Sequence, residues 1–385
     1  MTPAARLSAA ISVLDQVLRG QSAEQALTNW GRASRFAGSG DRAAVRDIVF
    51  DCLRCRRSFS ALGGAETGRG LVLGHLRAGG GDPAALFTGE GHAPALVTAA
   101  EAGRLPEGAE ALDCPDWLKT LLEQSLGADV SPVLMALRQR APVFLRVNLA
   151  RADRPRAEAA LLAAGIATRP HPLASSALEV VDGARKIQTS APYLDGLVEL
   201  QDASSQAVVE ALPLRDGMRV LDLCAGGGGK TLAMAARARL TLYAHDADPR
   251  RMRDLTPRAT RAGVKVTLTD MPEKTGPYDL ILADVPCSGS GSWRRDPEGK
   301  WRLTPARLAE LVSLQAQILD RAARMVRPGG VIGHATCSLL SAENGDQVTA
   351  FLTRHPGWTA TLTRSFTPLQ GGDGFFLSLL QAPQA

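Results

Sequence analysis

The sequence predicts a multidomain protein with an all-α N-terminal domain, a small α/β middle segment and a C-terminal α/β domain. Three observations predict this arrangement. Apolar residues recur at helical spacing before about residue 130, short strand patterns follow residue 141, and strands alternate with helices from about residue 203 onward. Such alternation is typical of a doubly wound, mostly parallel sheet. We assign residues 1–135, 140–200 and 201–385 to the three parts, a division that 385 residues allow.

The N-terminal domain begins with an amphipathic helix. The stretch "RLSAAISVLDQVLRG" places apolar side chains on one helical face, namely those of Leu7, Ile11, Leu14, Val17 and Leu18. Gly20 follows as a helix stop. The stretch "DRAAVRDIVFDCLRCRR" repeats the spacing, with Asp41 as its predicted N-cap. Residues 63–110 are rich in Gly and Ala and give weaker signals.

Strand patterns mark the rest of the chain. In the middle segment, "PVFLRVNLA" and "ALEVV" predict strands around a helix in "RPRAEAALLAAG". In the C-terminal domain, predicted strands lie in "RVLDLC", "LTLYAHD", "VKVTLTD", "YDLILADV" and "GGVIGHATCS". Ligands of such sheets bind beyond the carboxyl ends of the strands. The residues that follow each strand are therefore the candidates for a site.

The net charge and the cysteine content indicate the kind of partner and the cellular compartment. The net charge of +5 is compatible with a polyanionic partner such as RNA, although a GC-rich coding bias toward arginine gives the same excess without any function. The six cysteines are scattered, and no secretory signal or long apolar run precedes or interrupts them. We therefore expect a monomeric cytoplasmic protein that has no membrane segment.

The most informative stretch is the glycine loop in "VLDLCAGGGGKT", residues 220–231. A phosphate-binding P-loop would need a glycine at 224, where the chain has Cys224. The dinucleotide fingerprint is also absent, because Gly226 to Gly229 are contiguous. A run of glycines still lets a ligand approach the backbone closely.

Acidic residues after the early strands indicate which ligand the loop holds. Asp246, Asp270 and Asp284 follow the second, third and fourth predicted strands. An acid in the first of these positions accepts hydrogen bonds from ribose hydroxyls, and an acidic edge repels a triphosphate. S-adenosylmethionine, an adenosine with a sulfonium cation, fits best. Each aspartate alone is equally well explained as a turn residue or an N-cap.

Two cysteines follow the remaining strands. Cys287 lies in "ADVPCSGSG" and Cys337 in "HATCSLLSAEN", so both are expected at the same edge. Cys52, Cys55 and Cys114 are expected to be buried apolar residues, because most free cysteines are. The single C-x-x-C of Cys52 and Cys55 has no second pair, so we expect no metal.

A cysteine, an acid and a methyl donor together suit methylation of cytosine at C5. A thiolate that adds to C6 makes C5 electron-rich, a carboxyl group near N3 absorbs charge, and the thiol is eliminated after methyl transfer. A second cysteine would assist proton removal or release of the product.

These motifs resemble the Nop/Sun family of RNA 5-methylcytosine methyltransferases. The resemblance runs from about residue 142 to the C-terminus, through "FLRVN", "LQDASSQ", "DLCAGGGGKT", "HDADPRRM", "DVPCSGSG", "RRDPEGKWR", "ATCSLLSAEN" and "DGFF". It implies a Rossmann-like class I methyltransferase domain. It makes Cys337 the nucleophile, Cys287 the cysteine used in release, and Asp284 a contact to the base. The implied cofactor residues are Cys224, Ala225, Gly226, Gly227, Gly228, Gly229, Lys230, Asp246, Asp270 and Asp284. The family loop usually has Pro at the position of Gly227.

The N-terminal helices resemble the NusB-like domain of the bacterial RsmB-like (Fmu/Sun) branch, which methylates 16S ribosomal RNA. The resemblance makes a set of basic residues candidate RNA contacts: Arg42, Arg46, Arg54, Arg56, Arg57, Arg146, Lys300 and Arg302. Other hypotheses stay open: the same chemistry on transfer RNA or another RNA, a non-catalytic RNA-binding or antitermination factor, and a nucleotide hydrolase that uses "GGKT". The paired cysteines argue against a mere binding factor, and Cys224 argues against the hydrolase.

Overall fold

The computed structural model describes residues 1–384, which form two compact units. The first, the helical unit, comprises Met1–Arg140 together with Trp293–Arg302. The second, the sheet unit, comprises Ala141–Ser292 and the chain from Leu303 onward. The helical unit thus includes a short segment from within the region that sequence analysis assigned to 201–385.

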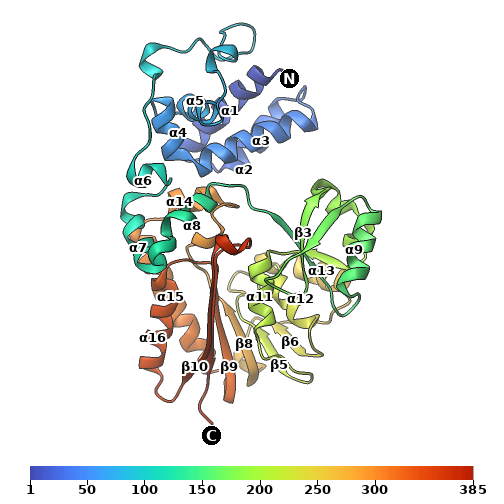
Figure 1. Ribbon diagram of the computed structural model, residues 1–385. Helices are drawn as coiled ribbons and strands as arrows, with labels where there is room; N and C mark the ends of the chain where they lie inside the picture. The colour runs from blue at the N-terminus through green and yellow to red at the C-terminus, as the bar shows by residue number, and fades with distance from the viewer. Residues whose placement is uncertain (385) are drawn as a thin grey trace. The chain divides into compact units, whose positions relative to one another are not determined.

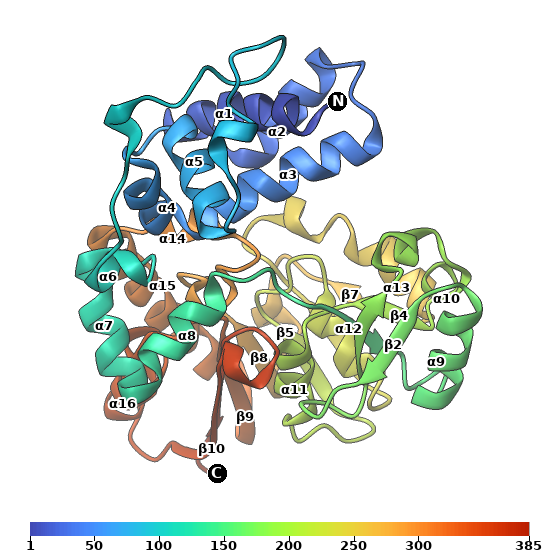
Figure 2. The same ribbon diagram turned by 45° about the horizontal axis from the view of Figure 1, so that its top comes forward.

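The helical unit is built from short amphipathic helices (Figure 2). They are α1 (Pro3–Leu18), α2 (Ala23–Ala33), α3 (Ser39–Arg54), α4 (Arg56–Gly63), α5 (Gly68–Ala78), α6 (Gly108–Ala111), α7 (Asp116–Leu126), α8 (Val130–Leu137) and α14 (Pro297–Arg302). On α1, Leu7 and Leu14 are buried in the core, and Ile11, Val17 and Leu18 pack against it as predicted. Gly20 follows α1 at a φ of 102°, as expected of a stop.

The start of α3 differs from the prediction. The helix begins at Ser39 with Gly38 as its N-cap, so the prediction of Asp41 as the cap was wrong. Asp41 lies in the first turn, where its carboxylate accepts a hydrogen bond from the Gly38 N–H at 3.2 Å. An acidic side chain satisfies the free N–H groups of a helix start from inside the helix as well as from the cap.

The segment Trp293–Arg302 is fixed to the helical unit by buried polar contacts. Trp301 donates its indole N–H to the Leu53 carbonyl at 2.6 Å. Glu298 accepts the Ala23 N–H at 3.0 Å, at the start of α2. Trp293 is only 2% exposed. The segment therefore belongs to the core of this unit rather than to a surface loop.

The sheet unit contains a small antiparallel sheet of order β2-β3-β1-β4. Its strands are β1 (Val143–Val147), β2 (Ala167–Pro170), β3 (Ala177–Asp182) and β4 (Val198–Leu200), and its helices are α9 (Arg154–Ala163) and α10 (Ala191–Leu194). Figure 2 shows α9 and α10 beside β2 and β4. Alternate residues of β1 enter a core with α9, in which Leu145, Val147 and Leu161 are fully buried.

The larger sheet has the order β10-β11-β9-β8-β5-β6-β7. Its strands are β5 (Arg219–Asp222), β6 (Thr241–Ala244), β7 (Thr267–Leu268), β8 (Tyr278–Asp284), β9 (Val326–Thr336), β10 (Thr359–Phe366) and β11 (Phe375–Gln381). The five strands from β9 to β7 pair in parallel, as predicted, and β11 and β10 extend the β9 edge in antiparallel fashion. The helices are α11 (Ala203–Glu210), α12 (Gly229–Ala235), α13 (Leu255–Ala262), α15 (Pro305–Ala323) and α16 (Gly345–Arg354).

Helices cover both faces of this sheet (Figure 1). Leu280 and Leu282 of β8 face a core with α11 and α12, whereas Ile281 faces a second core with α15 and α16. This alternation buries β8 on both sides, which explains its continuous apolar sequence. Among residues 1–384, no helix is both long enough and apolar enough to cross a membrane.

Candidate active site

The candidate site lies at the carboxyl edge of the larger sheet. The parallel strands β5, β6, β7 and β8 end in register at this edge, so the loops that follow them converge. The glycine loop follows β5, and the predicted acids Asp246, Asp270 and Asp284 follow or end β6, β7 and β8. Chain topology thus brings these candidates to one edge.

The glycine loop takes a conformation that needs glycine. Gly226 and Gly228 have φ values of 49° and 80°, in the left-handed region that favours glycine. A Cβ on Gly228 would lie 2.0 Å from Leu255 Cδ1, so no larger residue fits there. Around these turns, Ala225 donates its N–H to the His245 carbonyl at 2.9 Å. Within the loop, residues 223–228, Cys224 and Gly227 are partly exposed and the other residues are buried.

Lys230, in the first turn of α12, does not point out as a phosphate-binding lysine would. Its ammonium group donates to Asp284 at 2.7 Å and lies 4.7 Å from the centre of the Phe375 ring. Burial acts to lower the pKa of Lys230, but the charge of Asp284 more than offsets it, so the pKa is raised. The lysine therefore stays protonated and ties the glycine loop to the end of β8.

Asp246 is buried and holds the glycine loop from the neighbouring strand. Its carboxylate accepts the N–H groups of Gly226 and Asp248, each at 3.0 Å, and lies 3.3 Å from the Arg251 guanidinium. Asp270 lies just past β7 and is exposed. These two acids and the glycine loop thus occupy neighbouring strand ends.

Cys287 and Cys337 meet at the same edge. Their Sγ atoms are 3.4 Å apart, on the loops that follow β8 and β9. Both are free thiols that are partly exposed as residues. The backbone links the two loops as well, because Gly291 donates its N–H to the Cys337 carbonyl at 2.9 Å. The structure therefore presents two thiols side by side.

The surroundings of the two thiols differ. A hydrogen bond from Cys287 lowers the pKa of Cys337, and the Lys230 ammonium and Ser292 act in the same direction, against burial and Asp284. The same hydrogen bond raises the pKa of Cys287. Cys337 is therefore the thiol that ionises first, which is the property of a nucleophile.

Three other cysteines, Cys52, Cys55 and Cys114, are apolar core residues, as predicted. Cys52 and Cys114 are fully buried and Cys55 is 7% exposed. Burial raises the pKa of Cys55 and Cys114 to about 11. Burial also raises the pKa of Cys224 well above its ordinary value, so this thiol of the glycine loop stays protonated.

Sequence reasoning missed the carboxylate that positions both cysteine loops. Glu343 is fully buried and accepts the Ser288 N–H at 2.8 Å and the Gln315 side-chain amide at 3.0 Å. Its second oxygen accepts the hydroxyls of Ser288 and Ser338, both at 2.5 Å. Each serine directly follows one of the two cysteines. The only sequence signal was an acid among serines in "CSLLSAEN", which looks like a surface turn.

Two further titratable residues, Asp222 and His334, are buried near the carboxyl edge of the sheet. Burial raises the pKa of Asp222 to about 7, although its carboxylate accepts the Thr231 hydroxyl at 2.6 Å. His334 is fully buried, lies 3.1 Å from the Glu343 carbonyl through Nε2, and has a pKa lowered by burial to about 4. His334 is thus a neutral core residue.

The structure separates the predicted RNA contacts into two groups. Three candidates are buried: Arg54, Arg146 and Lys300. Arg54 donates to the Arg294 carbonyl at 2.8 Å, and Arg146 donates to the Gly229 carbonyl at 2.7 Å. Lys300 donates to the carbonyl of Arg54 at 3.2 Å. Burial lowers the pKa of Arg146 to about 10 and that of Lys300 to about 8. A buried cation that already binds carbonyl oxygens does not reach a phosphate. We therefore no longer count these three residues among the candidate RNA contacts.

The remaining candidates are at least partly exposed. Arg46, Arg56, Arg57 and Arg302 pair with Glu24, Glu66, Asp116 and Glu298, and Arg42 donates to the Ala37 carbonyl at 3.0 Å. Exposed ion pairs are weak, so their arginines remain available to another anion. All five belong to the helical unit.

Comparison with known proteins gives two family matches. Residues 209–381 match the family described as 16S rRNA methyltransferase RsmB/F. Residues 114–187, which contain β1, β2 and β3 of the small sheet, match the ferredoxin-like domain of RsmF/B-like methyltransferases. The chain is 34% identical over 283 residues to ribosomal RNA small subunit methyltransferase B of Serratia proteamaculans and 36% over 292 residues to that of Salmonella newport. Each match covers 69% of this chain and 66% of the relative, just under two thirds of its length.

Solved structures share the fold. The crystal structure of PH0851 matches with a TM-score of 0.78 and 23% identity over 99% of both chains. A methyltransferase homologue from Pyrococcus horikoshii matches with a TM-score of 0.63 and 24% identity, covering 71% of this chain and 97% of its own. At these identities the likeness concerns the fold alone.

Proposed function

Because the chain belongs to the RsmB/F family of methyltransferases, we propose that it transfers a methyl group from S-adenosylmethionine to C5 of a cytosine in 16S ribosomal RNA. The observation that carries this proposal is the 3.4 Å separation of the Cys287 and Cys337 thiols beside the Lys230–Asp284 ion pair. The names of the matched family and relatives support ribosomal RNA as the substrate.

The residues at the carboxyl edge fit S-adenosylmethionine. Gly227 and Gly229 leave partly exposed backbone without side chains, which allows a ligand to approach, and in this proposal the carboxylate of Asp246 beside the loop accepts ribose hydroxyls. The exposed carboxylate of Asp270 adds negative charge, which suits a sulfonium cation and opposes a triphosphate, whereas Asp284 is paired with Lys230. When bound, the cofactor supplies an electrophilic methyl group for C5.

Cys337 acts as the nucleophile in this proposal. Its thiolate adds to C6 of the cytosine, a C6–S bond forms, and the electron pair of the C5–C6 double bond moves to C5. The Asp284–Lys230 pair holds a proton near N3 and stabilises the charge that reaches the ring. The hydrogen bond from Cys287 and the Lys230 charge lower the pKa of Cys337, which favours the thiolate in this step.

Cys287 acts in release. After C5 has gained its methyl group, the C5 proton passes to a water molecule. The electron pair of that C–H bond re-forms the C5–C6 double bond, and the C6–S bond breaks with its electron pair left on the Cys337 sulfur. Cys287 lies next to the sulfur that departs and donates a hydrogen bond to it, which stabilises the leaving thiolate.

RNA binding involves the exposed arginines of the helical unit, namely Arg42, Arg46, Arg56, Arg57 and Arg302. We place the reaction in the cytoplasm, where ribosomal RNA is made in bacteria. The target base has to leave any stack before its C6 can meet Cys337.

Methyl transfer to purified RNA tests the proposal. The protein is incubated with S-adenosylmethionine labelled in its methyl group and with 16S ribosomal RNA, 23S ribosomal RNA or transfer RNA, and the digested nucleosides are separated. We expect label in 5-methylcytidine from 16S ribosomal RNA. Label in transfer RNA alone would establish the same chemistry on another substrate. No label in any RNA, with RNA binding intact, would favour a non-catalytic RNA-binding factor.

A nucleotide hydrolase that uses "GGKT" is a weaker candidate. The Lys230 ammonium, which such an enzyme would place on phosphates, is engaged by Asp284 and Phe375. A thermal unfolding series separates the two hypotheses, since S-adenosylmethionine rather than ATP should raise the midpoint.

A further inference from the structure

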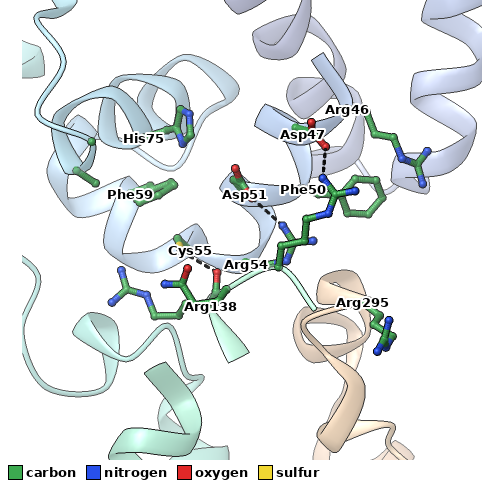
Figure 3. A pocket seen from close by; sticks show the side chains of 14 residues that line it. Arg46, Asp47, Phe50, Asp51, Arg54, Cys55, Phe59, His75, Arg138 and Arg295 are labelled. Carbon is green, nitrogen blue, oxygen red and sulfur yellow. Dashed lines mark hydrogen bonds and ion pairs between the residues drawn. The ribbon is translucent and has the colours of Figure 1, made fainter. Parts of the chain in front are cut away.

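A cavity of about 680 Å³ opens on the helical unit, between α3, α5 and the residues that follow α8 (Figure 3). Five arginines line it, namely Arg46, Arg54, Arg138, Arg140 and Arg295. Arg295 comes from the segment Trp293–Arg302, which is part of the same unit. The other lining residues lie between Arg46 and Arg140, so they precede the glycine loop and both cysteines in the chain.

The cavity carries a net positive charge. Its lining holds five arginines and two acids, Asp47 and Asp51, while Arg46 and Arg138 also pair with Glu24 and Asp113, which lie outside the lining. His75 also lines the cavity, and burial lowers its pKa, so it is neutral near pH 7. An excess of guanidinium groups around one opening favours a ligand with several anionic oxygens.

The inner arginines are fixed in place. The Arg54 side chain is 8% exposed and donates to the Arg294 carbonyl at 2.8 Å and to Asp51 at 2.7 Å. Arg138 pairs at 2.8 Å with Asp113, whose side chain is fully buried. These contacts hold the inner wall in one geometry before any ligand arrives.

The outer arginines can exchange their partners. The side chain of Arg140 is 70% exposed and pairs with Asp47 at 3.1 Å, and that of Arg46 is 49% exposed and pairs with Glu24. Exposed ion pairs of this kind contribute little free energy, so a phosphate group can replace the carboxylate at small cost. The rim is therefore suited to bind a phosphodiester chain.

An aromatic ring distinguishes a nucleotide chain from a simple anion. The Arg46 guanidinium carbon lies 4.9 Å from the centre of the Phe50 ring, and both residues line the cavity. Figure 3 shows the two side chains next to each other. Guanidinium planes and aromatic rings are the surfaces on which unpaired bases stack. A free phosphate would make no use of them.

We infer that this cavity binds a single-stranded segment of the RNA substrate, with phosphates on Arg46 and Arg140 and a base on the Arg46–Phe50 pair. The inference rests on the proposed function, because it takes the RNA to be the methyl acceptor. Arg295 stands eight positions after Cys287 (295 − 287 = 8), so the loop that leaves β8 supplies both an active-site cysteine and one wall of the cavity.

Salt-dependent binding of a labelled 12-nucleotide single-stranded RNA to the full chain tests the inference. The double variant Arg46→Gln with Arg140→Gln removes the two rim contacts. Each phosphate contact on single-stranded RNA contributes about 0.7 to the slope of log affinity against log salt, so the slope should fall by about 1.4. If the parent protein and the variant bind equally at 1 M salt, the variant should bind the RNA about 25-fold more weakly than the parent at 0.1 M salt.

The matched control is Arg104→Gln with Arg169→Gln. These side chains are 64% and 66% exposed, also pair with carboxylates, and lie outside the cavity. Binding of S-adenosylmethionine checks that each variant is folded, and the single variant Arg140→Gln, at the more exposed of the two rim positions, serves if the double variant does not fold. We expect the control to bind RNA like the parent protein.

The possible outcomes separate this inference from the proposed function. Unchanged RNA binding in the cavity variant, or an equal loss in the control, would overturn the inference even if the parent protein methylates RNA. Loss of binding to the small ribosomal subunit with unchanged binding of the oligonucleotide would overturn it in favour of a protein ligand. If the parent protein methylates no RNA yet loses RNA affinity only in the cavity variant, the proposed acceptor role fails while the RNA-binding cavity stands.

Discussion

The Sγ atoms of Cys287 and Cys337 lie 3.4 Å apart although 50 positions separate them in the sequence. The parallel pairing of β8 with β9 produces this proximity, because the two strands end at the same edge and each cysteine follows its strand within three residues. The two thiols share a hydrogen bond in which either sulfur can donate, and this hydrogen bond lowers the pKa of Cys337. The pair thus contains one thiol poised to ionise and one that stays protonated.

Replacing the nucleophile should stop the reaction without disturbing the cofactor site. We expect Cys337→Ala to lower kcat by at least about 10³-fold, because no other thiol replaces the lost nucleophile. Affinity for S-adenosylmethionine, measured by calorimetry, should stay unchanged. Cys55→Ala serves as the control, since Cys55 is a buried core residue of the helical unit. Normal turnover by the Cys337 variant would disprove its assignment as the nucleophile.

Glu343 should act on catalysis through the two cysteine loops. We expect Glu343→Gln to lower kcat by about 10- to 100-fold, because an amide cannot accept from all four donors and small displacements of reacting groups are costly. The KM for S-adenosylmethionine should not change. Glu310→Gln, a change on the exposed face of α15, is the control. A raised KM with unchanged kcat would contradict a positioning role for Glu343.

Asp246 should contribute to cofactor affinity. We expect Asp246→Asn to weaken binding of S-adenosylmethionine by roughly 1–3 kcal/mol, because an amide is a poorer acceptor for two ribose hydroxyls. Asp248→Asn, two residues along the chain and more exposed, should bind normally. Calorimetric titration measures both. Equal affinities for the parent and the Asp246 variant would rule out the ribose contact.

Asp222 should make stability depend on pH in an unusual direction. Burial raises its pKa to about 7 from an ordinary value of 3.8, so the folded state holds this proton more tightly than the unfolded state. Its contribution to stability is therefore full below about pH 4 and is lost as the pH rises to about 7. Relative to the parent, Asp222→Asn should gain stability over this interval and then level off. Urea unfolding at pH 5 and pH 8 gives the comparison, and a difference that does not vary with pH would refute the assignment.

The strand ends and their polar residues could be read from the sequence because the signal there is local. Apolar runs such as those of β5 and β8 stop at Asp222 and Asp284, and parallel pairing then brings the following loops together. Glu343 could not be found in this way. A charged residue is ordinarily exposed, and the donors that hold this one come from three separate places in the chain, at Ser288, Gln315 and Ser338.

The segment Trp293–Arg302 escaped prediction for a related reason. Its basic residues suggested an RNA-binding loop, but Lys300 and Trp301 are used to bind the carbonyls of Arg54 and Leu53 at the end of α3. Likewise, Arg146 looks like a surface cation of a strand, whereas its guanidinium is buried against the Gly229 carbonyl. Periodicity and composition indicate only the local structure around a residue. The roles of Lys300, Trp301 and Arg146 depend instead on contacts with distant parts of the chain, so the sequence pattern does not reveal them.

The most direct test of the account uses Cys287→Ser incubated with S-adenosylmethionine and 16S ribosomal RNA, followed by a denaturing gel. The account predicts a protein–RNA band that survives denaturation, because the C6–S bond forms through Cys337 but is not broken without Cys287. That band should vanish when Cys337 is also replaced by Ala. Absence of the band from a Cys287 variant whose parent methylates the RNA would contradict the assignment of the two cysteines.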